Sequence, residues 1–414
     1  MTRALLLLLS VLFAQIPFEQ AISDLKSTDP DVRFRAAQML KEAAHPEAAI
    51  PLARLVTDPV DDVQLQAIAA EVNIFLAEKI VVRKRVGFIV EVRNPIVAET
   101  AFTSGPLVLG PRPVPPEVLS ALRAAAADNH PRIALEALYA FGTLAVQPGG
   151  AARRELLRAS APSLTALTGA ADPALRYAAL RVLGRLFEPR RQDEPIDQSA
   201  GDAIITTLND RDRTLKIAAM QALGSMRYER SVQALIDLYR YYRKGDEAAA
   251  ALDALARIGH ESAMPLFTAQ LQSRNTPLRS AAIEGIARVG DRTKLAEIEK
   301  ATGGDRNDVV LLAGSFAAVL LGSSPIDAIV EALVKPRLRG QAKQYLVEIA
   351  AGRPTILSRQ AQDPDARMRI DVVDVLGLTY DPAALPLAQS LQKDKDPEVA
   401  RAADRAVARL KAAS

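Results

Sequence analysis

The phrase DPALR, at Asp172–Arg176, opens an Ala-rich amphipathic stretch and decides the fold, because the chain repeats it. The same pattern of Asp or Asn, an apolar residue and a basic residue returns as DPDVR (Asp29–Arg33), DRTLK (Asp212–Lys216), NTPLR (Asn275–Arg279) and DARMR (Asp365–Arg369). A unit that recurs in this way cannot bury its apolar face alone and stacks on its neighbours. The sequence therefore predicts a solenoid.

The register of the repeat is set by the apolar residue of the phrase, which we number position zero. It falls at Val32, Val63, Ile133, Leu175, Leu215, Glu247, Leu278, Val310, Leu338, Met368 and Val399. Position four is small in ten of these eleven copies, which predicts that two helix backbones approach closely there, and position eight is apolar in all but Glu71. Apolar residues at zero, four and eight describe one face of an α-helix.

Most copies also carry helix-boundary signals. Asp or Asn stands three residues before position zero in seven of the eleven copies, and Pro follows it in Asp29-Pro30, Asp172-Pro173 and Asp396-Pro397, which predicts an N-cap and a first-turn proline. Gly259, Gly290 and Gly322, at position twelve, predict helix C-termini. A second apolar-periodic segment follows, such as 232–239, so each unit of about 31 residues is expected to form two antiparallel helices.

These features resemble the HEAT repeat family, in particular the short-period variety of phycobilin-lyase-like proteins. The resemblance covers most of residues 18–413. It implies an all-α, right-handed α-solenoid of about eleven HEAT-like helical hairpins with one irregular insertion. An aromatic content of 4% and the absence of Trp agree with helices rather than strands. HEAT proteins are chiefly binding scaffolds, so the resemblance implies a non-catalytic role in protein–protein interaction.

The N-terminus has the layout of a bacterial secretory signal peptide. Arg3 precedes the run Ala4–Ala14, which is apolar except for Ser10 and too short to span a bilayer. We expect cleavage near Ala14 and a periplasmic or secreted protein. The alternative is a cytoplasmic scaffold in which the same run is an unprocessed first helix.

The spacing predicts four segments: a signal peptide at 1–14, N-terminal repeats at 15–79, an insertion at 80–116 and a continuing solenoid at 117–414. The gap of 70 residues between Val63 and Ile133 indicates the insertion. Its Pro and Gly residues forbid a continuous helix, and Val86–Val92 has the composition of a strand. Longer turns are expected at 146–152 and 187–199.

No residue pattern indicates catalysis. The chain has no Cys, and its three histidines, His45, His130 and His260, stand in different repeats without ligand spacing. His260-Glu261 is one dipeptide of the kind that deoxyhypusine hydroxylase, a HEAT-like enzyme, needs in several copies. We therefore expect no catalytic residue, cofactor or metal, and a lyase-like or carboxylate-based enzyme remains the less favoured alternative.

The charge pattern argues against a nucleic-acid partner. The formal net charge is only +3, whereas nucleic-acid binders concentrate Lys and Arg on one face. The basic residue that follows position zero stands four residues after an Asp or Asn, which predicts ion pairs within one helix. The local clusters Arg83-Lys84-Arg85 and Arg190-Arg191 are interpreted as solvated turns.

The candidate binding surface lies on the second helices, which line the concave groove of HEAT-like stacks. Positions six and ten point away from the expected core, and their mixture of aromatic residues, Arg and acids is typical of protein interfaces. The candidates are Tyr139, Arg181, Arg185, Gln221, Asp253, Arg257, Glu284, Arg288, Phe316, Gln344 and Glu348. Secondary candidates are Arg83, Lys84 and Arg85 in the insertion, and Tyr241, which we expect to be free while Tyr239 packs. The identity of the protein partner does not follow from the sequence.

Overall fold

The computed structural model describes residues 18–77, 97–104, 109–190, 194, 197–322 and 324–413. All regular structure in these residues is helical, as the repeat pattern predicts. No helix in these ranges has the length and apolar character needed to cross a membrane. The run Ala4–Ala14, the strand-like segment Val86–Val92 and the cluster Arg83-Lys84-Arg85 lie outside the described residues.

The chain divides into two compact units. The described part of the first unit lies within residues 18–104 and 114–144, and that of the second within 109–113 and 145–413. Hairpins of the first unit pair α1 (Phe18–Asp24) with α2 (Pro30–Ala43), α3 (Ala49–Ala53) with α4 (Asp61–Phe75), and α6 (Pro116–Ala125) with α7 (Pro131–Leu144). One further helix, α5 (Val97–Ser104), packs on α7.

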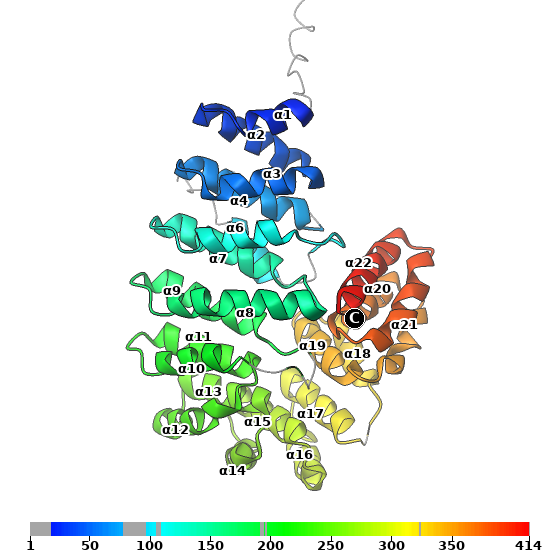
Figure 1. The fold of residues 1–414 in the computed structure, drawn as a ribbon. Coiled ribbons are helices and arrows are strands. Elements are labelled where there is room, and N and C mark those ends of the chain that lie inside the picture. The colour runs from blue at the N-terminus through cyan, green and yellow to red at the C-terminus, as the bar shows by residue number, and fades with distance from the viewer. Residues whose placement is uncertain are drawn as a thin grey trace, which may run out of the picture. The chain divides into compact units, whose positions relative to one another are not determined.

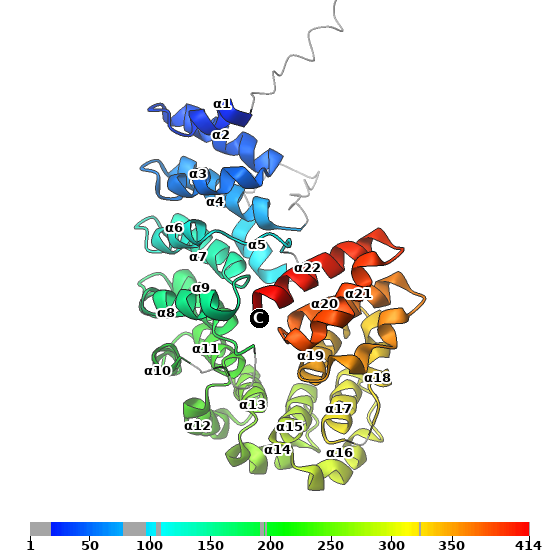
Figure 2. The same ribbon diagram turned by 45° about the vertical axis from the view of Figure 1, so that its right-hand side comes forward.

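The second unit continues the array with eight hairpins, which Figures 1 and 2 show in chain order. They pair α8 (Gly150–Leu167) with α9 (Pro173–Leu186), α10 (Gln198–Thr207) with α11 (Arg213–Ser225), α12 (Val232–Tyr242) with α13 (Asp246–Ile258), α14 (Met264–Gln270) with α15 (Thr276–Val289), α16 (Leu295–Thr302) with α17 (Asp308–Leu320), α18 (Asp327–Glu331) with α19 (Arg339–Ala350), the turns η8 (Pro354–Leu357) and η9 (Gln360–Gln362) with α20 (Ala366–Leu378), and α21 (Leu385–Ser390) with α22 (Pro397–Ala413). With the three hairpins of the first unit, the described residues form the eleven hairpins of the predicted α-solenoid.

Short 3-10 turns lead into or extend the first helices of many hairpins. They are η1 (Pro46–Ala48), η2 (Arg54–Thr57), η4 (Glu229–Ser231), η5 (Glu261–Ala263), η6 (Arg292–Lys294), η7 (Ala332–Val334), η10 (Pro382–Ala384) and η11 (Leu391–Lys393). The predicted helix boundaries are confirmed. The carboxylates of Asp29 and Asp172 accept the N–H groups of Asp31 and Ala174 at the start of α2 and α9.

The phrase-bearing helices pack on one another in a continuous row through α9, α11, α13, α15 and α17. Glycine at position nine brings the backbones together, because a Cβ on Gly184 would lie 2.8 Å from the Cα of Ala222, and one on Gly224 would lie 2.8 Å from the Cα of Ala254. The predicted small residues at position four are also buried, for example Ala219. This row forms one layer of the second unit.

The basic residue after position zero has a structural role, but the prediction that it forms an ion pair within its own helix is wrong. In four copies it pairs with a carboxylate in the turn of the following hairpin rather than with the Asp or Asn four residues before it, because that residue caps its own helix. The pairs are Arg33 with Asp58, Arg176 with Asp210, Arg279 with Asp305 and Arg369 with Asp394, at 2.6–2.8 Å. In the fifth copy, Lys216 donates to the Tyr242 hydroxyl at 2.5 Å. The resulting ladder joins each of these hairpins to the next.

Candidate functional site on the inner face of the second unit

The side chains of the phrase-bearing helices show which side of the row is concave. Arg288 of α15 donates from Nε to Glu348 of α19 at 3.1 Å, and the hydroxyl of Tyr345, also on α19, donates to Glu284 of α15 at 2.6 Å. Packed helix axes lie about 8–10 Å apart, so α15 and α19, with α17 between them, meet in this way only where the row curves. We call this side of the second unit the inner face.

One part of the inner face is closed by a network of polar and aromatic side chains. Arg288 also donates to Glu284 at 3.0 Å, and its guanidinium lies 5.0 Å from the ring centroid of Phe316 on α17. The Phe316 ring stacks on Tyr345 at 4.1 Å. We call Glu284, Arg288, Phe316, Tyr345 and Glu348 the closed end.

The closed end corrects the expected exposure of Phe316. Its side chain is fully buried rather than facing solvent, because α15 and α19 converge over α17. Burial alone would lower the pKa of Arg288, but the carboxylates of Glu348 and Glu284 more than offset this and raise it. The positive charge of Arg288 is therefore neutralised within the protein.

Tyr139 is also buried, in contrast to the expectation that it faces solvent. Its ring lies 5.3 Å from that of Phe102 on α5, the helix that packs on α7. The irregular part of the chain between two repeats thus contributes α5, and α5 covers Tyr139, which stands at position six of α7. Truncating Tyr139 would consequently disturb the core of the first unit.

Arg257 and Arg227 occupy an open part of the inner face. Arg257 donates from Nε to Asp253 at 2.9 Å, which confirms the predicted acid-before-base pair on α13. Its side chain is 39% exposed. Arg227 follows α11 with a side chain that is 38% exposed, and it approaches Glu348 at 3.9 Å. Both guanidinium groups reach water.

Glu188, just after α9, lies at the centre of a group of arginines. It touches solvent, but the protein around it raises the pKa of its carboxyl. Four nearby guanidinium groups lower the pKa of Glu188, but by less than burial raises it. They belong to Arg257, Arg227, Arg153 and Arg185. We call these four residues and Arg190 the arginine cluster.

Arg185 and Arg190 retain little compensation for their burial. Desolvation lowers the pKa of Arg185 to about 10, against the opposing effects of Tyr380 and Glu188. It lowers the pKa of Arg190 to about 10 as well, although Tyr380 and Glu194 act in the opposite direction. This contrasts with the fully neutralised Arg288 of the closed end.

Arg190 is fixed in place, so its interpretation as part of a solvated turn is wrong. Its guanidinium lies 4.0 Å from the ring centroid of Tyr380 and donates to the carbonyl oxygens of Pro148, at 2.7 Å, and Val146. These contacts join α8 and α9 to the turn after α20 within the second unit. The approach of Ala412 to Gly149 brings the end of α22 to the same place, near the C label in Figures 1 and 2.

Of the other predicted residues, Arg181 stands one turn before Arg185 on α9 and its charge lowers the pKa of Arg185. Arg181 donates to the Tyr177 hydroxyl at 3.0 Å, and Gln221 and Gln344 are exposed. Tyr241 is 79% exposed while Tyr239 is buried, as expected for this pair.

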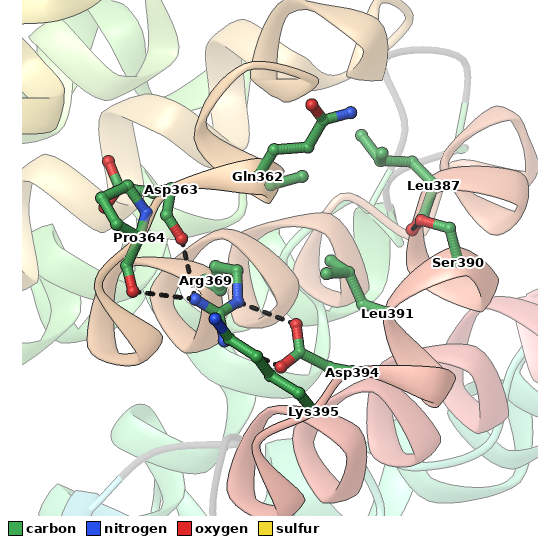
Figure 3. Close-up of a pocket in the computed structure, with 10 residues that line it drawn as sticks. Gln362, Asp363, Pro364, Arg369, Leu387, Ser390, Leu391, Asp394 and Lys395 are labelled. Atoms are coloured by element: carbon green, nitrogen blue, oxygen red, sulfur yellow. Dashed lines mark hydrogen bonds and ion pairs between the residues drawn. The ribbon is translucent and has the colours of Figure 1, made fainter.

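A surface hollow of about 410 Å³ lies between the turn before α20 and the turn before α22 (Figure 3). Its main polar groups belong to the ladder. Arg369 donates twice to Asp394, at 2.8 Å each, and to the carbonyl oxygens of Asp363 and Pro364. Because the same pairing recurs in other repeats, we assign this hollow a structural role.

The histidines serve local structure in the described residues. His260 caps the turn before α14 by accepting the N–H of Ser262 through Nδ1, and His130 lies 3.7 Å from Asp61. The described ranges contain no group of three or more metal-ligating side chains.

Sequence reasoning missed several residues of the inner face: Arg153, Glu188, Arg190, Arg227, Tyr345 and Tyr380. Positions six and ten exclude them, because Tyr345 stands at position seven of α19 and the others stand in turns or, for Arg153, on a first helix. For Arg227 and Tyr380 a signal existed, since both occupy position twelve, where three other repeats have Gly.

Two stretches of the second unit, residues 160–244 and 243–317, match the profile of HEAT repeats. No curated protein matches the sequence. An engineered protein has 18% identity and a TM-score of 0.43, with 95% of this chain and 98% of that one covered. The complex of CpcE and CpcF of phycocyanin lyase from Nostoc sp. has 19% sequence identity and a TM-score of 0.41, with 61% of this chain and 94% of that one covered. A designed armadillo repeat protein in complex with peptide (KR)4 has 15% sequence identity and a TM-score of 0.39, with 66% of this chain and 99% of that one covered.

Proposed function

We propose that this protein is a non-catalytic, extracytoplasmic scaffold that binds a protein partner on the inner face of the second unit. The observation that carries the proposal is the pair of water-exposed guanidinium groups of Arg227 and Arg257 on a curved surface. Arginine is among the residues that dominate binding energy at protein interfaces. The ion pair with Asp253 restrains Arg257, which limits the entropy lost when a partner binds.

The proposed location rests on the sequence of the N-terminus. Arg3 followed by Ala4–Ala14 has the charge and length of a secretory signal. N-terminal sequencing of protein from the native host tests this proposal, with an expected start near Gln15. Intact Met1 in a cytosolic fraction would favour a cytoplasmic scaffold instead.

The partner is tested by affinity capture from the native envelope, followed by titration of the captured protein. Arg227→Ala and Arg257→Ala should each weaken binding, while the melting temperature changes little because both side chains reach water. Tyr241→Ala removes an exposed ring elsewhere and serves as the matched control. It should leave the affinity unchanged.

The rival surface is the insertion with Arg83, Lys84 and Arg85. A variant with residues 80–115 replaced by a Gly-Ser linker separates the two surfaces. Full binding by the arginine variants, together with loss in the linker variant, would transfer the site to the insertion. A small molecule that copurifies with the protein and is turned over would favour the lyase-like or carboxylate-based enzyme.

A further inference from the structure

We propose that the arginine cluster binds an extended peptide segment rich in Asp and Glu, with Arg227 and Arg257 as the principal contacts. This inference rests on the proposed function and names the chemical class of the partner. The argument uses the local charge, the donors available on the two side chains, and the backbone conformation at Arg227.

The local charge around Glu188 is positive. The closed end neutralises Arg288 with Glu284 and Glu348, both within hydrogen-bonding distance. The other arginines here are Arg153, Arg181, Arg185, Arg190, Arg227, Arg257 and Arg409. The carboxylates that act on them are Glu188, Glu194 and Asp253, together with Glu284 and Glu348, which also neutralise Arg288. Carboxylates from a partner would complete the neutralisation.

Hydrogen-bond donors are available for such carboxylates. A guanidinium has five N–H donors, and its paired terminal groups match the two oxygens of a carboxylate. Arg257 uses Nε for Asp253, and its terminal nitrogens have no hydrogen-bond partner among the described residues. The contact of Arg227 with Glu348, at 3.9 Å, is longer than a hydrogen bond.

The backbone at Arg227 points to a role for its side chain. Arg227 has φ 50°, a left-handed conformation that favours glycine, and it occupies position twelve of its repeat. Gly259 and Gly290, with φ 70° and 83°, occupy the same position in the following repeats. An arginine that occupies this position carries a conformational cost that its distant contact with Glu348 does not explain. The proposed peptide contact would use the side chain that Arg227 presents where those repeats have glycine.

A peptide fits the inner face better than a nucleic acid does. The carboxylates of Glu188 and Asp253 lie among the guanidinium groups and would repel a continuous run of phosphates. A peptide can place its carboxylates opposite Arg227 and Arg257 and present neutral residues to the acids between them. The partner segment therefore has acidic residues separated by uncharged ones.

The experiment measures binding of a fluorescent dodecapeptide of alternating Glu and Ser to the full chain by anisotropy. Peptides with Gln or Lys in place of Glu, and duplex DNA, are the comparison ligands. The Glu peptide should bind, more weakly as salt increases, and the Gln and Lys peptides should not. Arg257→Ala and Arg227→Gly should each weaken binding about tenfold or more, as expected for loss of a charge-assisted hydrogen bond.

Arg227→Gly has a second readout, because glycine relieves the left-handed strain. This variant should melt at a higher temperature while it binds more weakly, a combination that a purely structural arginine would not give. Ala44→Gly is the matched control, since Ala44 has φ 52° at position twelve in the first unit. It should raise the melting temperature and leave peptide binding unchanged.

Equal binding of the Glu and Gln peptides, or unchanged affinity in both arginine variants, would overturn the inference. Tighter binding of duplex DNA than of the Glu peptide would do so too, in favour of a polynucleotide. If the Glu peptide fails but the captured partner still depends on Arg257, the acidic class is wrong and the scaffold function stands. If the captured partner is also insensitive to Arg227 and Arg257, the proposed inner-face site is wrong as well.

Discussion

Glu71 is predicted to destabilise the first unit at neutral pH. It stands at position eight of its repeat, where the other copies have apolar residues, and it is fully buried in α4. Neither carboxylate oxygen has a hydrogen-bond partner in the part of the chain that the structure describes. Burial raises its pKa well above the ordinary value of 4.5. The informative perturbation is Glu71→Gln, which keeps the shape and removes the ionisation.

The magnitude follows from proton linkage. A carboxyl that remains protonated when folded and ionises when unfolded lowers the unfolding free energy as pH rises, by about 1.4 kcal/mol per pH unit. The loss begins near the unfolded pKa of about 4.5 and ends at the folded pKa. Between these two pKa values wild type loses about 1.4 kcal/mol for each pH unit, a loss that Glu71→Gln lacks.

Urea unfolding followed by circular dichroism between about pH 4 and pH 8 measures this difference, because the chain has no Trp for fluorescence. Hydrogen exchange in α4 assigns the effect to the first unit. Glu19→Gln, at an exposed position on α1, is the matched control and should follow wild type. A stability difference between wild type and Glu71→Gln that does not change with pH would refute the reasoning.

Three further predictions concern the packing of the second unit. Gly224→Ala should destabilise it by about 1–3 kcal/mol, because the new Cβ would lie 2.8 Å from the Cα of Ala254. Gly340→Ala is the control and should not destabilise the unit, because a Cβ on Gly340 would have no neighbouring atom within 4 Å. Equal urea midpoints for the two variants would contradict the close packing at Gly224. Arg369→Ala should cost about 1–3 kcal/mol in urea melts, because it removes the guanidinium partner of the half-buried Asp394; an unchanged urea midpoint would contradict this role. The hydrogen bond from Arg369 lowers the pKa of Asp394, so wild type should lose stability as pH falls through that lowered pKa. Asp394→Asn should lack this component of the acid titration, and an identical pH profile would refute the assignment.

The sequence predicted the hairpins and their order because each repeat carries its own signals. Asp172 and Pro173 begin α9, Gly259 ends α13, and both effects act within a few residues of chain. The ladder could not be paired from sequence alone. Arg369 reaches Asp394 across 25 residues, and that distance depends on how one hairpin stacks on the next.

The site was predicted only in part, because curvature is a property of the stack rather than of one repeat. The sequence predicted that Asp253 and Arg257 form a pair on one helix, and the structure confirms this pair. Phe316 has the same position in its repeat as Asp253, yet it is covered because α15 and α19 converge there. Glu188 and Arg190 stand in the turn after α9, where helical periodicity gives no information about which face a residue joins.

Position twelve has a left-handed backbone in several repeats that have no glycine there, including Ala44, Arg227 and Tyr380. A non-glycine residue in the left-handed region costs about 1–2 kcal/mol, and both Arg227 and Tyr380 carry this cost, with φ 50° and 51°. Arg243, with φ 60°, donates to the carbonyl oxygen of Arg240 at the end of its own helix, so a local contact offsets its cost. Tyr380 instead contacts Arg190, which is distant in the sequence. Tyr380 serves the packing of Arg190, and the peptide experiment tests whether the side chain of Arg227 serves binding on the inner face.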